Sequence, residues 1–226
     1  MPATESRRGA AGGRQALLFA GGDAPPAPAS IPGLLPLGER ALVVCADAGL
    51  VHCLHAGLIP HRLVGDFDSV DETSLQRAEA AGAQRIRFPR AKSASDLALA
   101  LEGLCEDGVD RVTVLGVSGG RTDHLLFNWA LAAWREWPFS LRLVDASCDA
   151  CVVTCERALV FQSKPDALVS LLPLTRVRGV TTHGLQYALT DHAIPPGDTL
   201  GLSNVACGGE VRVAVSRGTL LVLRVR

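Results

Sequence analysis

Two aspartates, Asp66 and Asp68, stand one residue apart directly after a short apolar run, in the segment VGDFDSVD (residues 64–71). In an extended segment alternate side chains point the same way, so both carboxylates would project together while Phe67 faces the opposite side. Adjacent carboxylates are the hard oxygen ligands that suit Mg²⁺ carrying the phosphates of a substrate. The pair therefore predicts a metal site, with an ordinary solvated turn as the alternative.

Two further acids occupy comparable positions. Asp47 ends the apolar run VVCADAG, and Asp96 falls in the first turn of a predicted helix. In parallel sheets, ligands bind at the carboxyl ends of the strands, where such residues gather. Several acids at these points favour a metal site over isolated turns.

A glycine pair marks a second candidate site, in the segment SGGRTDH (residues 118–124) between a predicted strand and a predicted helix. Gly119 and Gly120 let the backbone approach an anion, the start of the helix offers free N–H groups, and Arg121 adds a planar guanidinium. This arrangement predicts phosphate binding. The segment Gly21–Asp23 after the first strand is either a second such loop or a simple tight turn.

His124 and Asn128 lie four residues apart and therefore share one face of the same predicted helix. Both could reach a ligand near the start of the helix. Both could equally tie the preceding loop to the helix, and the spacing does not separate the two interpretations.

These residues must be positioned by the elements around them, and from residue 16 to about 147 apolar runs alternate with amphipathic segments. This alternation predicts a doubly wound, mostly parallel α/β sheet with helices on both faces. One of the helices is expected from Thr122 to Trp137, ended by Pro138.

After about residue 155 the helical patterns vanish and short β-prone runs separated by turn residues predict an all-β sandwich. The last two runs are expected to form a hairpin through Ser216–Gly218. We therefore expect a disordered tail at 1–15, a catalytic α/β domain at 16–153 and a β-sandwich at 154–226.

Composition narrows the class of function. The chain has 226 residues, of which 48% are hydrophobic, and a net charge of −1, which gives no general field for nucleic acid or an anionic membrane. No run approaches the roughly 20 apolar residues that a membrane helix needs. The odd count of seven cysteines argues against a secreted chain with paired cysteines. We expect a cytoplasmic protein with neither a nucleic-acid nor a membrane partner.

A phosphatase is one alternative for the paired aspartates. The stretch DFDSV resembles the first motif of haloacid-dehalogenase-type phosphatases, in which the first aspartate is the nucleophile. That family also has a later pair of metal-binding acids after a strand, whereas here the strand VLGV is followed by SGGR. The surrounding pattern therefore fits this alternative poorly.

The ordered set of motifs resembles the thiamine pyrophosphokinase family. The residues that carry the resemblance span nearly the whole chain: Ala46–Gly49, Gly57–Pro60, Gly65–Ser69, Ser95–Asp96, Gly119–His124 with Asn128, Gly184–Tyr187 and Ser203–Asn204.

The resemblance implies an N-terminal domain that binds ATP and Mg²⁺, a C-terminal β-sandwich, and a homodimer with thiamine bound between subunits. It also implies roles for individual residues. Metal would be held by Asp47, Asp66, Asp68 and Asp96; ATP would contact Asp47, Gly119, Gly120, Arg121, Asp123 and His124; thiamine would meet Tyr187, Ser203 and Asn204; and Asp66, Asp68, Asp96 and Arg121 would be catalytic. A core aromatic is the alternative for Tyr187.

The chain departs from the family in one segment. The family usually has an additional acid before Ser95–Asp96, where this chain reads Lys92-Ser93-Ala94. Ser93 cannot supply a carboxylate, although it could cap the following helix.

The predicted activity is transfer of the pyrophosphoryl group of ATP to the hydroxyl of thiamine, giving thiamine diphosphate and AMP. Two alternatives stay open at this point. The acceptor could be another hydroxymethyl heterocycle such as a pterin, or the chain could bind nucleotide or thiamine without turnover.

Overall fold

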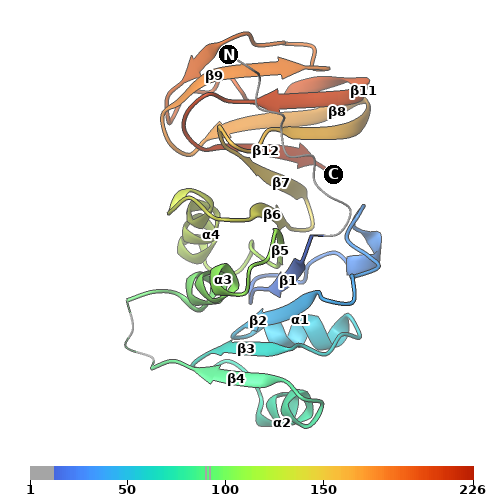
Figure 1. The fold of residues 1–226 in the computed structure, drawn as a ribbon, viewed down its shortest axis with the longest axis vertical. Helices are drawn as coiled ribbons and strands as arrows, with labels where there is room; N and C mark the ends of the chain where they lie inside the picture. The colour runs from blue at the N-terminus through green and yellow to red at the C-terminus, as the bar shows by residue number, and fades with distance from the viewer. Residues whose placement is uncertain (1–12, 90, 92) are drawn as a thin grey trace. The chain divides into compact units, whose positions relative to one another are not determined.

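A computed structural model describes residues 13–89, 91 and 93–226, and in it the chain forms two compact units (Figure 1). The α/β unit comprises Gly13–Leu131 and Trp137–Ala146, and the β unit comprises Ala132–Glu136 and Ser147–Arg226. The tail expected at 1–15 lies outside the described residues except for its last three. No helix within the described ranges is both long and apolar enough to cross a membrane.

The sheet of the α/β unit has six strands in the order β6-β5-β1-β2-β3-β4, and every neighbouring pair is parallel. The order reverses beside β1, since β2 to β4 follow on one side and β5 and β6 on the other. Ligands of parallel sheets bind at such a reversal, outside the carboxyl ends of the strands. The strands are β1 (Gln15–Phe19), β2 (Leu42–Ala46), β3 (Arg62–Gly65), β4 (Gln84–Arg87), β5 (Arg111–Leu115) and β6 (Ser140–Val144).

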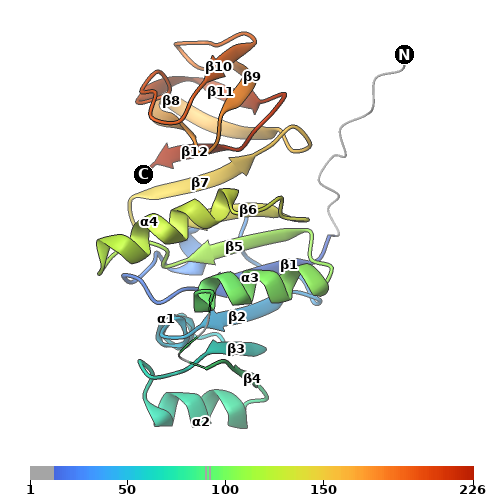
Figure 2. The same cartoon turned by 90° about the vertical axis from the view of Figure 1, so that its left-hand side faces the viewer.

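Helices cover this sheet, and Figures 1 and 2 draw α1 and α3 on its opposite sides. The helices are α1 (Gly49–His55), α2 (Glu72–Ala80), α3 (Asp96–Glu106) and α4 (Thr122–Ala130), with short 3₁₀ turns η1 (Pro28–Ser30) and η2 (Leu131–Ala133). Alternate residues of the strands, such as Leu17 and Phe19, pack with α1 and α2 in one buried cluster. The helix expected at 122–137 is shorter than predicted, because it ends at Ala130 and gives way to η2.

The sheet of the β unit has the order β10-β9-β11-β8-β12-β7, and all its paired strands are antiparallel. Its core consists of inward-facing residues such as Val169, Val180 and Val213. The strands are β7 (Cys148–Val153), β8 (Leu159–Pro173), β9 (Val177–His183), β10 (His192–Ile194), β11 (Asn204–Ala214) and β12 (Leu220–Val225).

The prediction of a hairpin through Ser216–Gly218 is wrong. The strands on either side of that turn, β11 and β12, both pair with β8, which lies between them. Gly218 nevertheless has the positive φ of 90° that a tight turn requires.

The mixed α/β class is confirmed, and the sandwich stays a prediction. In the structure the β unit resumes at Ser147, a few residues before the expected boundary at 153, because β7 pairs with β12. The predicted domain ranges concern independent folding units and stay predictions.

Candidate functional site

Three carboxylates converge at the carboxyl ends of β2 and β3. Asp47 follows β2, and Asp66 and Asp68 follow β3. One ligand oxygen from each lies within 4.8 Å of the other two. Three oxygens at this separation can bind one divalent cation, and we call this group the acid cluster.

The turn that presents Asp66 and Asp68 is not the extended segment that we expected. Strand β3 ends at Gly65, and Phe67 has a left-handed φ of 63°. The Phe67 side chain is buried, and the guanidinium of Arg85 lies 4.8 Å from its ring centroid. The buried ring therefore anchors the turn while the backbone amide of Asp68 donates to Asp66 Oδ1 (3.2 Å).

Gly65 allows Asp96 to approach the acid cluster from another element. A Cβ atom at Gly65 would lie 3.3 Å from Asp47 Cβ and 3.3 Å from Asp96 Oδ1. Asp96 is the first residue of α3, whose N-cap is Ser95, with its hydroxyl accepting from the Ala98 amide (3.2 Å). The expectation that Ser93 caps this helix is therefore wrong.

Asp47 is the member of the acid cluster whose negative charge is disfavoured by its surroundings. Its Oδ1 is buried and has no hydrogen-bond partner in the described part of the chain. Burial raises the pKa of this carboxyl, and the negative charge of Asp96 and, to a smaller extent, Asp66 and Asp68 raises the pKa further. A buried oxygen without a partner beside other carboxylates is a position that a cation would satisfy.

Two glycine-containing loops meet beside the acid cluster, one after β1 and the other after β5. The amide of Gly22 donates to Gly116 O (2.9 Å), and the amide of Asp23 donates to Ser118 O (2.7 Å). A Cβ at Gly22 would collide with Ser118 O. The glycine therefore permits the two loops to touch at the reversal point of the sheet.

The first of these loops also touches the strand end that carries Asp47. A Cβ at Gly21 would lie 2.9 Å from Ala48 Cβ. Gly119, with a φ of 102°, leaves the space that the Asp23 carboxylate occupies. The acid cluster and the SGGR loop are thus linked by direct contacts along one edge of the sheet.

Arg121 is the N-cap residue of α4 and pairs with Asp123. Its Nε donates to Asp123 Oδ1 (3.1 Å) and its Nη2 donates to Asp123 Oδ2. This pairing raises the pKa of Arg121 and lowers the pKa of Asp123. Both side chains are largely exposed, so the guanidinium is accessible to an anion that can compete with Asp123.

The other predicted members of this segment lie at the start of α4. His124 is exposed, whereas the Asn128 amide donates to Val117 O (3.0 Å). Asn128 therefore ties the loop to the helix, which was one of its two interpretations. Gly119 and Gly120 both have positive φ, 102° and 61°, so the loop needs both glycines.

A positioning network under the SGGR loop was missed by the sequence analysis. Ser118 Oγ donates to Asp145 Oδ2 (2.5 Å) and accepts from Trp129 Nε1 (3.1 Å). Asp145 follows β6, so the rule that singled out acids after strands would have found it.

The residues expected to meet thiamine lie in the β unit. Tyr187 is 62% exposed and is therefore not a core aromatic. Asn204 is buried; its side-chain amide donates to Tyr187 O (2.8 Å), and its Oδ1 accepts from the Tyr187 amide (3.1 Å). Asn204 thus holds the backbone of Tyr187. Ser203 is exposed with a φ of 55°, and its amide donates to Ser170 Oγ (3.0 Å).

Comparison with known proteins gives a consistent result over both units. Residues 37–137 match the family model described as thiamin pyrophosphokinase, catalytic domain, and residues 158–220 match thiamin pyrophosphokinase, vitamin B1 binding domain. The thiamine pyrophosphokinase of Bacillus subtilis is 29% identical over 188 residues, which cover 82% of this chain and 88% of the relative.

Solved structures agree with the sequence matches. A crystal structure of thiamine pyrophosphokinase from B. subtilis has a TM-score of 0.78 and 26% identity, covering 94% of this chain and 98% of the other. A thiamin pyrophosphokinase family protein from Enterococcus faecalis has a TM-score of 0.76 and 25% identity, covering 94% and 99% of the two chains.

Proposed function

The chain belongs to the thiamine pyrophosphokinase family, and from this premise we propose how its residues transfer the pyrophosphoryl group of ATP to thiamine. The products of the reaction are thiamine diphosphate and AMP. The hydroxyl oxygen of thiamine attacks the β-phosphorus of ATP, and the bond from that phosphorus to the α-phosphate oxygen breaks. Such a step depends mainly on alignment and on compensation of negative charge.

We assign the acid cluster and Asp96 to a divalent cation, which we propose is Mg²⁺. The residues present fit such an ion, because Asp47 Oδ1 is buried without a hydrogen-bond partner among the described residues and Asp47 lies among other carboxylates. When bound there, Mg²⁺ supplies positive charge that neutralises the transferring phosphates. Asp66 and Asp68 present their oxygens from a turn that the buried Phe67 ring holds in place.

Phosphate binding is assigned to the SGGR loop and Arg121. Gly119 and Gly120 leave the backbone accessible, and Arg121 exchanges its Asp123 partner for phosphate oxygens of ATP. Asp123 then acts as the resting partner that keeps the guanidinium near the loop. His124, exposed in the next position, contacts ATP in this proposal.

The thiamine site is assigned to Tyr187 and Ser203, with Asn204 as the residue that positions Tyr187. An exposed aromatic ring with a fixed backbone can stack on a flat heterocycle without first leaving a core. We further propose a homodimer with thiamine bound between subunits. The finer description of the fold, a doubly wound sheet followed by a β-sandwich, belongs to the same proposal.

The observation that carries the assignment of the metal site is the convergence of three carboxylates, one of which, Asp47, has a buried oxygen without a hydrogen-bond partner in the described ranges. The overall reaction is tested by incubating purified protein with ATP, Mg²⁺ and thiamine and separating the products by chromatography. AMP and thiamine diphosphate in equal amounts are expected. ADP with thiamine monophosphate would contradict the proposed attack at the β-phosphorus.

One observation favours a second candidate, binding without turnover. Ser93 stands where the family usually has an acid, and its hydroxyl is neutral, so it contributes no charge to the metal site. Thermal stabilisation by ATP and thiamine together with an absence of product would support this candidate. A large gain of turnover in Ser93→Asp would identify the missing acid as the cause.

A further inference from the structure

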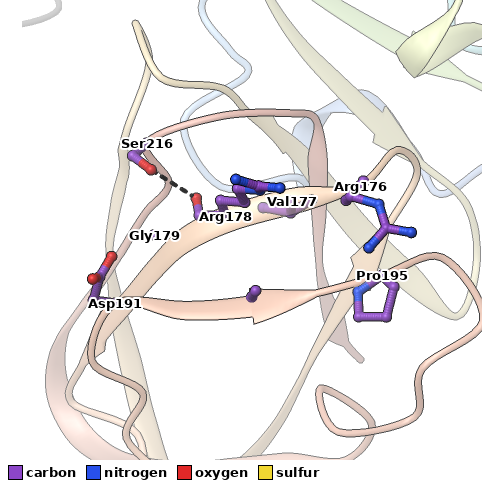
Figure 3. Close-up of a pocket in the computed structure, with 8 residues that line it drawn as sticks. Arg176, Val177, Arg178, Gly179, Asp191, Pro195 and Ser216 are labelled. Carbon is purple, nitrogen blue, oxygen red and sulfur yellow. Dashed lines mark hydrogen bonds between the residues drawn. The ribbon is translucent and has the colours of Figure 1, made fainter.

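The β unit contains a cavity that the proposed reaction does not use. It has a volume of about 410 Å³ and is lined by residues in or next to β9 and β10 and by Ser216, which follows β11 (Figure 3). Cavities of roughly 300–1,000 Å³ are typical of small-molecule sites. All its lining residues belong to the β unit, whereas the acid cluster belongs to the α/β unit. The two sites therefore share no residue.

Two arginines dominate the lining of this cavity. Arg176 precedes β9, Arg178 lies in β9, and both side chains are exposed. Neither arginine forms an ion pair with any residue in the ranges that the structure describes. Both guanidinium groups are therefore available to an anion in the cavity.

A third arginine increases the unbalanced charge beside them. Arg217 forms an isolated antiparallel bridge with Arg178, in which the Arg178 amide donates to Arg217 O (3.0 Å). Like charges directly opposite one another on paired strands destabilise the pairing. Arg217 likewise forms no ion pair with the residues that the structure describes, so an anion nearby would offset this repulsion.

The backbone around Arg178 is held in place by a neighbouring turn. Ser216 Oγ donates to Arg178 O (3.1 Å), as the dashed line in Figure 3 marks. Gly179, with a φ of 65°, leaves the space that the Ser216 side chain occupies. The Arg178 backbone is thus fixed before any ligand binds, which lowers the cost of ordering it.

Asp191, an acidic residue in the lining, restricts the size of the anion that the cavity can bind. Figure 3 shows Asp191 at the end of the cavity opposite Arg176 and Pro195, with Arg178 between them. A continuous phosphate backbone running through the cavity would be repelled at Asp191. A small anion confined to the arginine end would not meet this repulsion at close range.

Arg176 and Arg178 are two residues apart, which in an extended chain corresponds to roughly 7 Å between their backbones. Two planar guanidinium groups carried on backbones this far apart can each bind one of two linked phosphoryl groups, whereas a single carboxylate would engage only one of the guanidinium groups. We propose that this cavity binds the diphosphate group of a small molecule, with Arg176 and Arg178 as its ligands.

The test is titration of the full-length protein with inorganic pyrophosphate by isothermal titration calorimetry, at low salt and in EDTA. Without a metal the acid cluster repels pyrophosphate, so it does not contribute a competing site. The double variant Arg176→Ala/Arg178→Ala is expected to bind pyrophosphate about tenfold more weakly, at about two- to fivefold for each exposed arginine. Asp191→Asn is expected to bind it more tightly, because a repulsive charge is removed.

A matched control separates this site from general charge. Arg212→Ala/Arg226→Ala removes two exposed positive charges from the same unit outside the cavity and should retain the affinity of the unaltered protein. The SGGR loop is separated by titrating protein that already carries Arg121→Ala: adding Arg176→Ala/Arg178→Ala to it should still weaken pyrophosphate binding about tenfold. The proposal is overturned if the unaltered protein does not bind pyrophosphate, or if the cavity variants and the control have the same affinity.

Discussion

Replacing Asp47 with Asn should change the stability of the protein in opposite directions with and without a divalent cation. Without metal, Asp47 has an unpartnered buried oxygen and two carboxylate neighbours within 4.8 Å. Coulomb repulsion at this separation is about 1–3 kcal/mol for each pair at an effective dielectric constant of roughly 20–80. Asn keeps the shape of the side chain and tolerates the φ of 44°, so the substitution removes mainly the charge.

We therefore expect Asp47→Asn to raise the free energy of unfolding by about 1–2 kcal/mol in EDTA at pH 7. For a chain of this length that corresponds to an increase in Tm of about 2–8 °C. With Mg²⁺ and ATP the order should reverse, because the unaltered protein gains stability from binding that the variant lacks. Differential scanning calorimetry under the two conditions measures both effects.

The pH dependence of the stability difference between Asp47→Asn and the unaltered protein provides a second test. The pKa of Asp47 is raised in the folded protein, so its ionisation destabilises the fold fully above that raised pKa. The effect disappears below the unfolded value of about 4, where the carboxyl is protonated in both states. The advantage of the variant should therefore shrink as the pH falls towards 4. A variant less stable than the unaltered protein in EDTA at pH 7 would refute the reasoning, and exposed Glu39→Gln should change Tm little.

Four further predictions concern the other parts of the site. Arg121→Ala should raise the KM for ATP by about tenfold or more, because it removes a charged phosphate ligand, and an unchanged KM in steady-state assays would exclude the role. Asp123→Asn should lower that KM, since it frees the guanidinium without removing it. Asp145→Asn weakens the hydrogen bond from Ser118. The decrease in kcat should then be several times larger than the increase in the KM for thiamine, whereas equal changes in the two constants would indicate only a structural role. Tyr187→Ala should raise the KM for thiamine about tenfold with little change for ATP, whereas an unaltered thiamine dependence would remove the ring from the site.

The sequence predicted those features that depend on local pattern. Apolar runs identified the parallel strands, and the ends of those runs identified Asp47 and Asp66, because one edge of a parallel sheet collects all the strand ends. Asp96 was identified instead by its place in the first turn of a predicted helix. The carboxylates of Asp66 and Asp68 converge as expected, although the reason is a turn with left-handed Phe67 instead of an extended strand. An aromatic residue with positive φ has no local signal and depends on the buried core around it.

The features that the sequence did not predict depend on contacts between distant segments. Strand β8 runs through Pro165 and the left-handed Asp166, where the local pattern indicates a break between two strands. Pro165 is accommodated because the register of β8 against β11 shifts near that residue. The false hairpin at Ser216–Gly218 has the same origin, because a tight turn does not show that β8 will lie between the two strands.

The central claim, that the acid cluster holds the metal for ATP, is tested most directly by the turnover of Asp66→Asn and Asp68→Asn. Each variant keeps the size of the side chain and one oxygen but loses the charge, and its fold can be checked by circular dichroism. Product formation from ATP, Mg²⁺ and thiamine should fall about a hundredfold or more in both, as expected when charge compensation in the transition state is lost. Glu39→Gln should retain full turnover. Turnover at the level of the unaltered protein in both aspartate variants would contradict the assignment of the acid cluster.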